Sequence, residues 1–213
     1  MSKVEIYSGT ENDKTGIGIR IIDKKASVAD LLDGWQPLCD DDRLFKPYGN
    51  SNYSTCKGCI RNCCKTAYVI PDLIAFKKIA GYLGCNYQEF LNMYFDVEKT
   101  RLGLLRIRPN PCIFLENNIC TIYPIRALIC RFYLCSHLLG ETEQLIYSIT
   151  FAGIAATQRF AEKNKLVNTN ITNGLSSFDM LFTNLINEYH NSSKVDLFMQ
   201  ADDYNDIPLY PFL

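Results

Sequence analysis

Cysteine is the residue whose number and spacing in this sequence most clearly indicate chemistry. The chain has ten cysteines among 213 residues, and Cys39 and Cys85 stand apart from the others. The other eight form two groups, Cys56-x2-Cys59-x3-Cys63-Cys64 and Cys112-x7-Cys120-x9-Cys130-x4-Cys135. A CxxC pair lets two thiolates bind one metal ion from a single turn of backbone. We therefore expect the second group to complete a four-thiolate site or to form another.

The number of grouped thiols exceeds what one metal ion needs. Thiolates are soft ligands, so the candidates are zinc, an iron–sulfur cluster or cuprous copper. A tetrahedral ion takes four ligands, and the side chains of adjacent Cys63 and Cys64 diverge, so one of them could serve a second metal, face the core, or act as a redox or substrate thiol. The density favours a multi-metal or cluster site, most simply a 4Fe-4S cluster, over a single structural zinc ion.

The residues around the cysteines are compatible with a shielded metal site. Arg126 and Arg131 flank the second group, and a guanidinium would offset the negative charge of a four-thiolate site. The alternative is that both arginines are solvent-exposed residues of a helix with no role at a metal site. An apolar wrap would keep water from a cluster, although ordinary core packing explains the same residues. The interleaved residues are Ile60, Ile113, Phe114, Leu115, Ile119, Ile122, Tyr123, Ile129, Phe132 and Tyr133.

Catalytic residues of the usual types are not indicated. The only histidines are His137, which could be an imidazole ligand or a proton relay, and His190, which suits a charge partner at a helix end. No pair of carboxylates stands out as an acid–base couple. The sequence has no G-x-S-x-G, no P-loop and no Cys-His-Asn constellation. Catalytic residues therefore stay unassigned.

The order of the two cysteine groups resembles a known family. CKGCIRNCC followed by PCIFLENNICTIYPIRALICRFYLC is similar to the zinc- or iron-chelating cysteine-cluster family, often called YkgJ-like, over about residues 56–135. Three residues rather than two separate Cys59 from the adjacent pair, and Ala127 and Leu134 stand where the family commonly has proline. The matching positions are Cys56, Cys59, Cys63, Cys64, Cys112, Cys120, Tyr123, Arg126, Cys130 and Arg131.

The resemblance implies a metal-binding function. One branch of the family includes flagellin lysine N-methylase, which is taken to use an iron–sulfur cluster and S-adenosylmethionine. By resemblance, the grouped cysteines with Cys135 would bind the metal, and Tyr123, Arg126 and Arg131 would contact a cofactor. The implied reaction is methyl transfer to a peptide or protein, with contacts from residues 1–55 and 140–213. The alternatives are a non-catalytic zinc- or iron-binding protein for structure, storage or delivery, and a thiol redox protein, which here lacks a thioredoxin-like βαβ setting.

Composition limits the class of protein. Apolar residues make up 47% and charged residues 21%, and the formal net charge is −1, so neither a nucleic acid nor an anionic membrane is an expected partner. The N-terminus lacks the apolar region of a secretory signal, and no apolar run is long enough to span a membrane. We therefore expect a cytoplasmic protein, in which cysteines are more often metal ligands than parts of a disulfide framework.

The elements that must position the cysteines read as one α+β domain over residues 1–213, with a small antiparallel sheet and several helices. We expect an N-terminal extension over 1–55, a cysteine-rich metal-binding core over about 56–137 and a helical part over 140–213. Strands are predicted over 5–9, 16–23, 100–108, 112–115, 119–123 and 144–150. Helices are predicted over 26–34, 71–84, 86–96, 124–135, 151–166 and 175–190, with a tail that packs on the surface.

Overall fold

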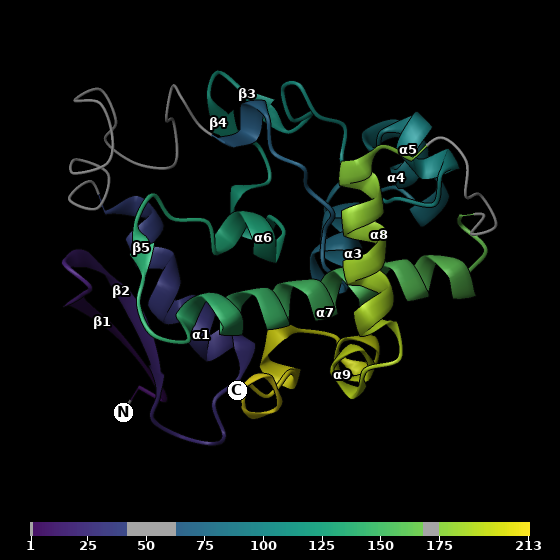
Figure 1. The fold of residues 1–213 in the computed structure, drawn as a ribbon. Coiled ribbons are helices and arrows are strands. Elements are labelled where there is room, and N and C mark those ends of the chain that lie inside the picture. Colours follow the sequence, from purple (N-terminus) through teal and green to yellow (C-terminus); the bar gives the residue numbers. More distant parts are fainter. Residues whose placement is uncertain (1, 42–62, 168–174) are drawn as a thin grey trace.

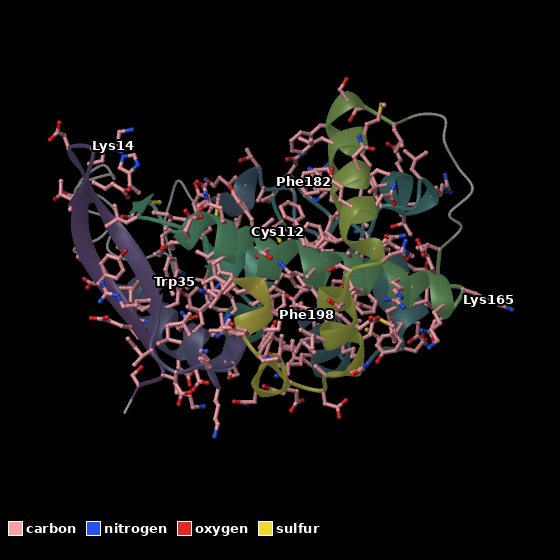
Figure 2. The ribbon with its side chains drawn as sticks, turned by 60° about the horizontal axis from the view of Figure 1, so that its bottom comes forward. Lys14, Trp35, Cys112, Lys165, Phe182 and Phe198 are labelled. Atoms are coloured by element: carbon pink, nitrogen blue, oxygen red, sulfur yellow. The ribbon has the colours of Figure 1, made fainter. Side chains whose placement is uncertain are left out.

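The computed structural model describes residues 2–41, 63–167 and 175–213. It confirms an α+β fold in which helix α7 (Thr142–Lys163) runs across the molecule (Figure 1). A small sheet lies at one end of α7, and α8 (Ser177–His190) crosses it toward the other end. Figure 2 shows Lys14 and Lys165 at opposite ends of the molecule and Cys112 near its middle. Among the described residues, no helix combines the length and apolar character needed to cross a lipid bilayer.

The two strands predicted over 5–9 and 16–23 are confirmed and form a hairpin. Strands β1 (Val4–Glu11) and β2 (Lys14–Ile21) pair antiparallel through a two-residue turn in which Asn12 and Asp13 both have positive φ. The short strand β5 (His137–Leu138) extends this sheet by pairing parallel to β2, which the sequence did not indicate. Gly16 permits the pairing, because a Cβ there would lie 2.6 Å from the carbonyl oxygen of His137.

Three helices before the second cysteine group lie where the sequence predicts them, over 26–34, 71–84 and 86–96, whereas the short helix Val97–Arg101 was not predicted. Helix α1 (Val28–Trp35) starts with a capping box of Ser27 and Asp30, and α4 (Tyr87–Tyr94) starts with one of Asn86 and Glu89. Both caps lie in the sequence directly before an apolar periodic run, so local chemistry fixes these starts. The remaining elements of this part are η1 (Gln36–Asp40), η2 (Cys63–Lys65), α3 (Leu73–Tyr82) and α5 (Val97–Arg101).

The strand predicted over 100–108 is wrong. Helix α5 ends within it, Gly103 turns the chain with a φ of 80°, and a single bridge joins Ile107 to Phe95. Consecutive Leu104 and Leu105 are both buried, at 3% and 0% exposed, so the two faces that a half-buried strand would alternate do not exist. The segment is an irregular connection held by the bond from the Ile107 amide to the carbonyl of Val69, at 2.8 Å.

The region of the second cysteine group contains a tight hairpin and a divided helix. Strands β3 (Leu115–Glu116) and β4 (Ile119–Cys120) flank Asn117 and Asn118, both with positive φ, and are shorter than the strands predicted over 112–115 and 119–123. The single helix predicted over 124–135 is instead η3 (Tyr123–Ile125) followed by α6 (Leu128–Arg131). Extended backbone at Arg126 and Ala127 separates the two helices and changes the direction of the chain between them.

The C-terminal part differs from prediction in three places, one of which is the unpredicted helix over Ser193–Gln200. The strand predicted over 144–150 is wrong, because α7 is one continuous helix of 22 residues whose inner face includes Leu145, Ile149 and Ala152. The tail does not pack on the surface: Ile207 and Leu209 are 0% exposed, and their backbone groups bond to the segment before α1. The other elements here are α9 (Ser193–Gln200), η4 (Tyr204–Asp206) and η5 (Tyr210–Phe212).

A buried carboxylate joins the elements that carry the cysteines. Asp72, 1% exposed, caps α3 by accepting from the Ala75 amide at 3.1 Å. It also accepts from the Leu128 amide at the start of α6 at 2.8 Å and from the Tyr204 hydroxyl at 2.9 Å. Three segments far apart in the chain thus meet at one side chain, and α7 approaches it closely through Gly153.

Replacing Asp72 with Asn should lower the free energy of unfolding by about 2–4 kcal/mol, because the amide nitrogen would face one backbone donor, the Leu128 or the Ala75 amide, that then lacks an acceptor. Urea unfolding of the full chain measures this value. Tyr204→Phe removes one of the three bonds and should cost about 1 kcal/mol. Equal stability of Asp72→Asn and the unaltered chain would contradict the role given to this carboxylate.

Candidate metal centre

Five of the eight predicted ligand cysteines line one cavity of about 60 Å³. Cys63 and Cys64 come from η2, Cys112 from the loop before β3, Cys120 from β4 and Cys130 from α6. The Cys112 amide donates to the carbonyl oxygen of Cys64 at 2.8 Å, so a backbone bond ties the two cysteine groups together. Residues distant in sequence therefore present their thiols to a shared space, which is the arrangement that thiolate metal sites use.

The remaining three predicted ligands are not among the described residues of the cavity wall. Cys56 and Cys59 are outside the described residues. Cys135 is exposed and does not line the cavity. His137 lies in β5, paired with Gly16, and is also absent from the cavity wall.

The two isolated cysteines have places of their own in the structure. The Cys39 thiol is buried and donates to the carbonyl oxygen of Arg131 at 3.3 Å. The Cys85 thiol lies near the Ala80 carbonyl oxygen, 3.7 Å away, at the end of α3. Neither cysteine lines the cavity, which agrees with their separation from the two groups in the sequence.

The rest of the cavity wall is mainly apolar. Of the interleaved residues named from the sequence, Phe114, Leu115, Ile122 and Tyr123 do line it, whereas Ile129, Phe132 and Tyr133 face a different cavity. Sequence reasoning missed several wall residues, which are Ala67, Val69, Ile107, Asn118 and Ala127. The apolar residues just after Cys64 and just before Cys112 could have indicated most of these wall residues, because both segments flank cysteines that face the cavity.

Arg126 supplies a buried positive charge at the cavity wall. The residue is 4% exposed, its Cζ lies 3.8 Å from the ring centroid of Tyr123, and its Nη1 donates to the Tyr123 carbonyl at 2.6 Å. Its Nη2 is buried and has no hydrogen-bond partner among the described residues. An unpaired guanidinium N–H is costly in an apolar interior, so this group is suited to an acceptor placed in the cavity.

The second predicted arginine takes a different position. The Arg131 guanidinium lies 5.8 Å from the ring centroid of Tyr204, and the residue is not part of the cavity wall. Burial lowers the pKa of Arg131. Arg126 and Arg131 both flank Cys130 in sequence, yet the structure places only the former beside the thiols.

The thiols of the cavity differ in acidity. A hydrogen bond from Cys63 lowers the pKa of Cys64 to about 7, with a further contribution from the charge of Arg126. Burial raises the pKa of Cys112 to about 11 and raises the pKa values of Cys120 and Cys130 as well, and neighbouring thiolates add to the effect. At neutral pH the buried thiols keep their protons unless a cation is present, so metal binding must release protons.

The donor chemistry fits a soft metal. The cavity offers five sulfur atoms, an apolar wall and one guanidinium, and zinc and iron–sulfur clusters are the usual partners of such a set. Within residues 2–41, 63–167 and 175–213, no three Cys, His, Asp or Glu side chains form a group that could hold a metal ion as they stand. A complete ligand set therefore requires rotation of these side chains, the addition of Cys56 and Cys59, or both.

Comparison with known proteins gave one family and one relative. The family model named CxxCxxCC, described as "Putative zinc- or iron-chelating domain", matches residues 55–165, which is more than half of the chain. A segment of 71 residues is 38% identical to "Uncharacterized protein MJ0661" of Methanocaldococcus jannaschii. The chain spans 38% of the length of that relative, and the match covers 32% of this chain. No solved structure matches the chain significantly.

In the metal-free chain, Cys64 should react with iodoacetamide with a pH midpoint near 7, whereas Cys112 should require a pH near 11. Mass spectrometry of the labelled peptides over a pH series measures both midpoints. Cys63→Ala removes the hydrogen bond to Cys64 and should move its midpoint up toward the ordinary value of about 8.5. If Cys63→Ala leaves the Cys64 midpoint unchanged, the stated cause of its acidity is wrong.

Proposed function

Because the chain belongs to the CxxCxxCC family of zinc- or iron-chelating domains, we propose that the cysteine cavity binds an iron–sulfur cluster. The observation that carries the proposal is the convergence of five thiols from both cysteine groups on one apolar cavity. The family itself indicates metal chelation, and the identity of the metal group as an iron–sulfur cluster is what we propose. Cys63, Cys64, Cys112, Cys120 and Cys130 would hold it, together with Cys56 and Cys59.

The number and setting of the thiols support a cluster over a single zinc ion. One tetrahedral zinc site needs four ligands, and five described cysteines already face the cavity before Cys56 and Cys59 are counted. The reduction potential of an iron–sulfur cluster depends on shielding from water and on hydrogen bonds to its sulfur atoms. The apolar wall provides the shielding, and the unpaired Nη2 of Arg126 provides a donor.

A transferase activity is the enzymatic extension of this proposal. A cluster with one iron not held by cysteine supplies a position at which a cosubstrate such as S-adenosylmethionine could bind. The resemblance to the methylase branch supports methyl transfer to a peptide or protein as the reaction. In this chain, Arg126 and Tyr123 stand at the cavity wall, where they could contact the cosubstrate or the cluster.

A non-catalytic role is the second candidate, and the small size of the cavity favours it. About 60 Å³ leaves little space beyond a metal ion and its ligands, as in a closed structural site. The protein would then use zinc or iron for stability, storage or delivery. Chelation should unfold such a domain, because the free energy of structural metal binding is coupled to folding.

Protein purified without air should contain about four irons and four sulfides per cluster and absorb broadly near roughly 400 nm. Cys130→Ser should reduce iron content and colour, since Cys130 faces the cavity. Cys85→Ser is the matched control, because Cys85 lies outside the cavity and should have no effect on iron content. Stoichiometric zinc in colourless protein would overturn the cluster and leave the non-catalytic candidate.

Arg126→Gln should lower metal affinity about tenfold, because residues that support metal ligands typically contribute factors of this size. Competition with a chelator measures the affinity. Arg126→Lys, which keeps the charge, should lose less, and Arg108→Gln tests removal of an exposed arginine nearby. Equal affinity of Arg126→Gln and Arg108→Gln proteins would show that the guanidinium does not act on the centre.

A further inference from the structure

A second cavity lies on the other side of α6 from the cysteines. Its volume is about 460 Å³, within the range of small-molecule sites. One wall is the segment from Ile129 to Leu134, and the opposite wall is the first part of α7. The lining residues are Ile129, Phe132, Tyr133, Leu134, Ser136, His137, Leu138, Glu143, Ile146, Tyr147 and Thr150.

The wall of this cavity combines apolar side chains with a few polar ones, among them Thr150, Glu143 and Tyr147. Thr150 is 2% exposed, and its Oγ1 has no hydrogen-bond partner among the described residues. A buried hydroxyl without a partner is uncommon and indicates that a ligand atom or water completes it. Glu143 and Tyr147 lie one helical turn apart on α7, both on the cavity wall. Burial raises the pKa of Tyr147, and so do the charge of Glu143 and a hydrogen bond from the Tyr147 hydroxyl to that carboxylate.

The charge of the lining is negative. Glu143 is the acidic residue of the wall, neither lysine nor arginine is among the lining residues, and His137 is the one basic side chain there. Tyr133 and Tyr147 line the cavity and are 53% and 52% exposed. Aromatic faces beside a carboxylate attract organic cations through the ring quadrupole and through the opposite charge.

We propose that this cavity binds an organic cation, specifically an alkylammonium group carried on an apolar stem. The ammonium would pair with Glu143 between the rings of Tyr133 and Tyr147. The stem would pack on Ile129, Phe132 and Ile146, and a polar atom of the ligand would complete the Thr150 hydroxyl.

This site is separate from the metal centre but shares a wall with it. Ile129 and Phe132 face the second cavity, while Cys130, which lies between them in the chain, faces the cysteines. Binding of the cation needs none of the metal ligands, so the inference stands or falls independently of the proposed cluster. The shared helix nevertheless places an occupant of one cavity close to an occupant of the other.

Three probes with the same stem and different head groups test the proposal on the full chain: hexylamine as its ammonium, hexanol and hexanoate. Calorimetry at neutral pH should show the ammonium binding about tenfold more tightly than hexanol, and hexanoate more weakly than either. Glu143→Gln should remove the preference of the ammonium over hexanol. Glu141→Gln is the matched control, since Glu141 is exposed near the start of α7 and does not line the cavity.

Thr150→Val keeps the shape of the side chain and removes the hydroxyl. Within the proposal, it should weaken binding of the longer probe 6-aminohexanol, which carries a second polar group, more than binding of hexylamine. Three probes of equal affinity, or a preference for ammonium that survives Glu143→Gln, would overturn the proposal. So would the absence of measurable binding by hexylamine.

Discussion

The carboxylate of Asp72 holds together the parts of the chain that build the cysteine cavity. Its three donors come from the start of α3, the start of α6 and the C-terminal segment. Burial alone raises the pKa of this carboxyl, and the three hydrogen bonds act in the opposite direction by stabilising its charged form. Because Leu128 begins the helix that carries Cys130, the position of that thiol depends on a residue far from it in sequence.

A second buried carboxylate supports the opposite side of the cavity. Asp179 caps α8 with Ser176 and accepts from Lys99 at 2.5 Å and from the Tyr68 hydroxyl at 3.0 Å. Burial would raise the pKa of Asp179, but the bonds from Lys99 and Ser176 hold it below its usual range. Tyr68 also stacks on Phe182, with ring centroids 4.5 Å apart. The segment after Cys64, which includes the cavity-wall residues Ala67 and Val69, is thus tied to α8 through Tyr68.

Features encoded by a few adjacent residues could be predicted, and features decided by distant packing could not. The turns at Asn12-Asp13 and Asn117-Asn118 were predictable because asparagine and aspartate tolerate positive φ. The stretch 144–150 was not, because its apolar residues suit a strand until the rest of α7 and its neighbours bury one helical face. In the site, cysteine spacing indicated metal binding but left open whether the two groups share one site. It could not separate Arg126 from Arg131, since the extended backbone at Arg126 and Ala127 decides which guanidinium turns inward.

The bond from Tyr204 to Asp72 also sets an order of events during synthesis. The chain leaves the ribosome with its N-terminus first, so every cysteine of both groups emerges before Tyr204 does. Until the C-terminal segment arrives, Asp72 lacks one of its three donors, and Ile207 and Leu209 are not in place beneath α1. The segment that completes the three hydrogen bonds of Asp72 is therefore synthesised after every cysteine of the chain.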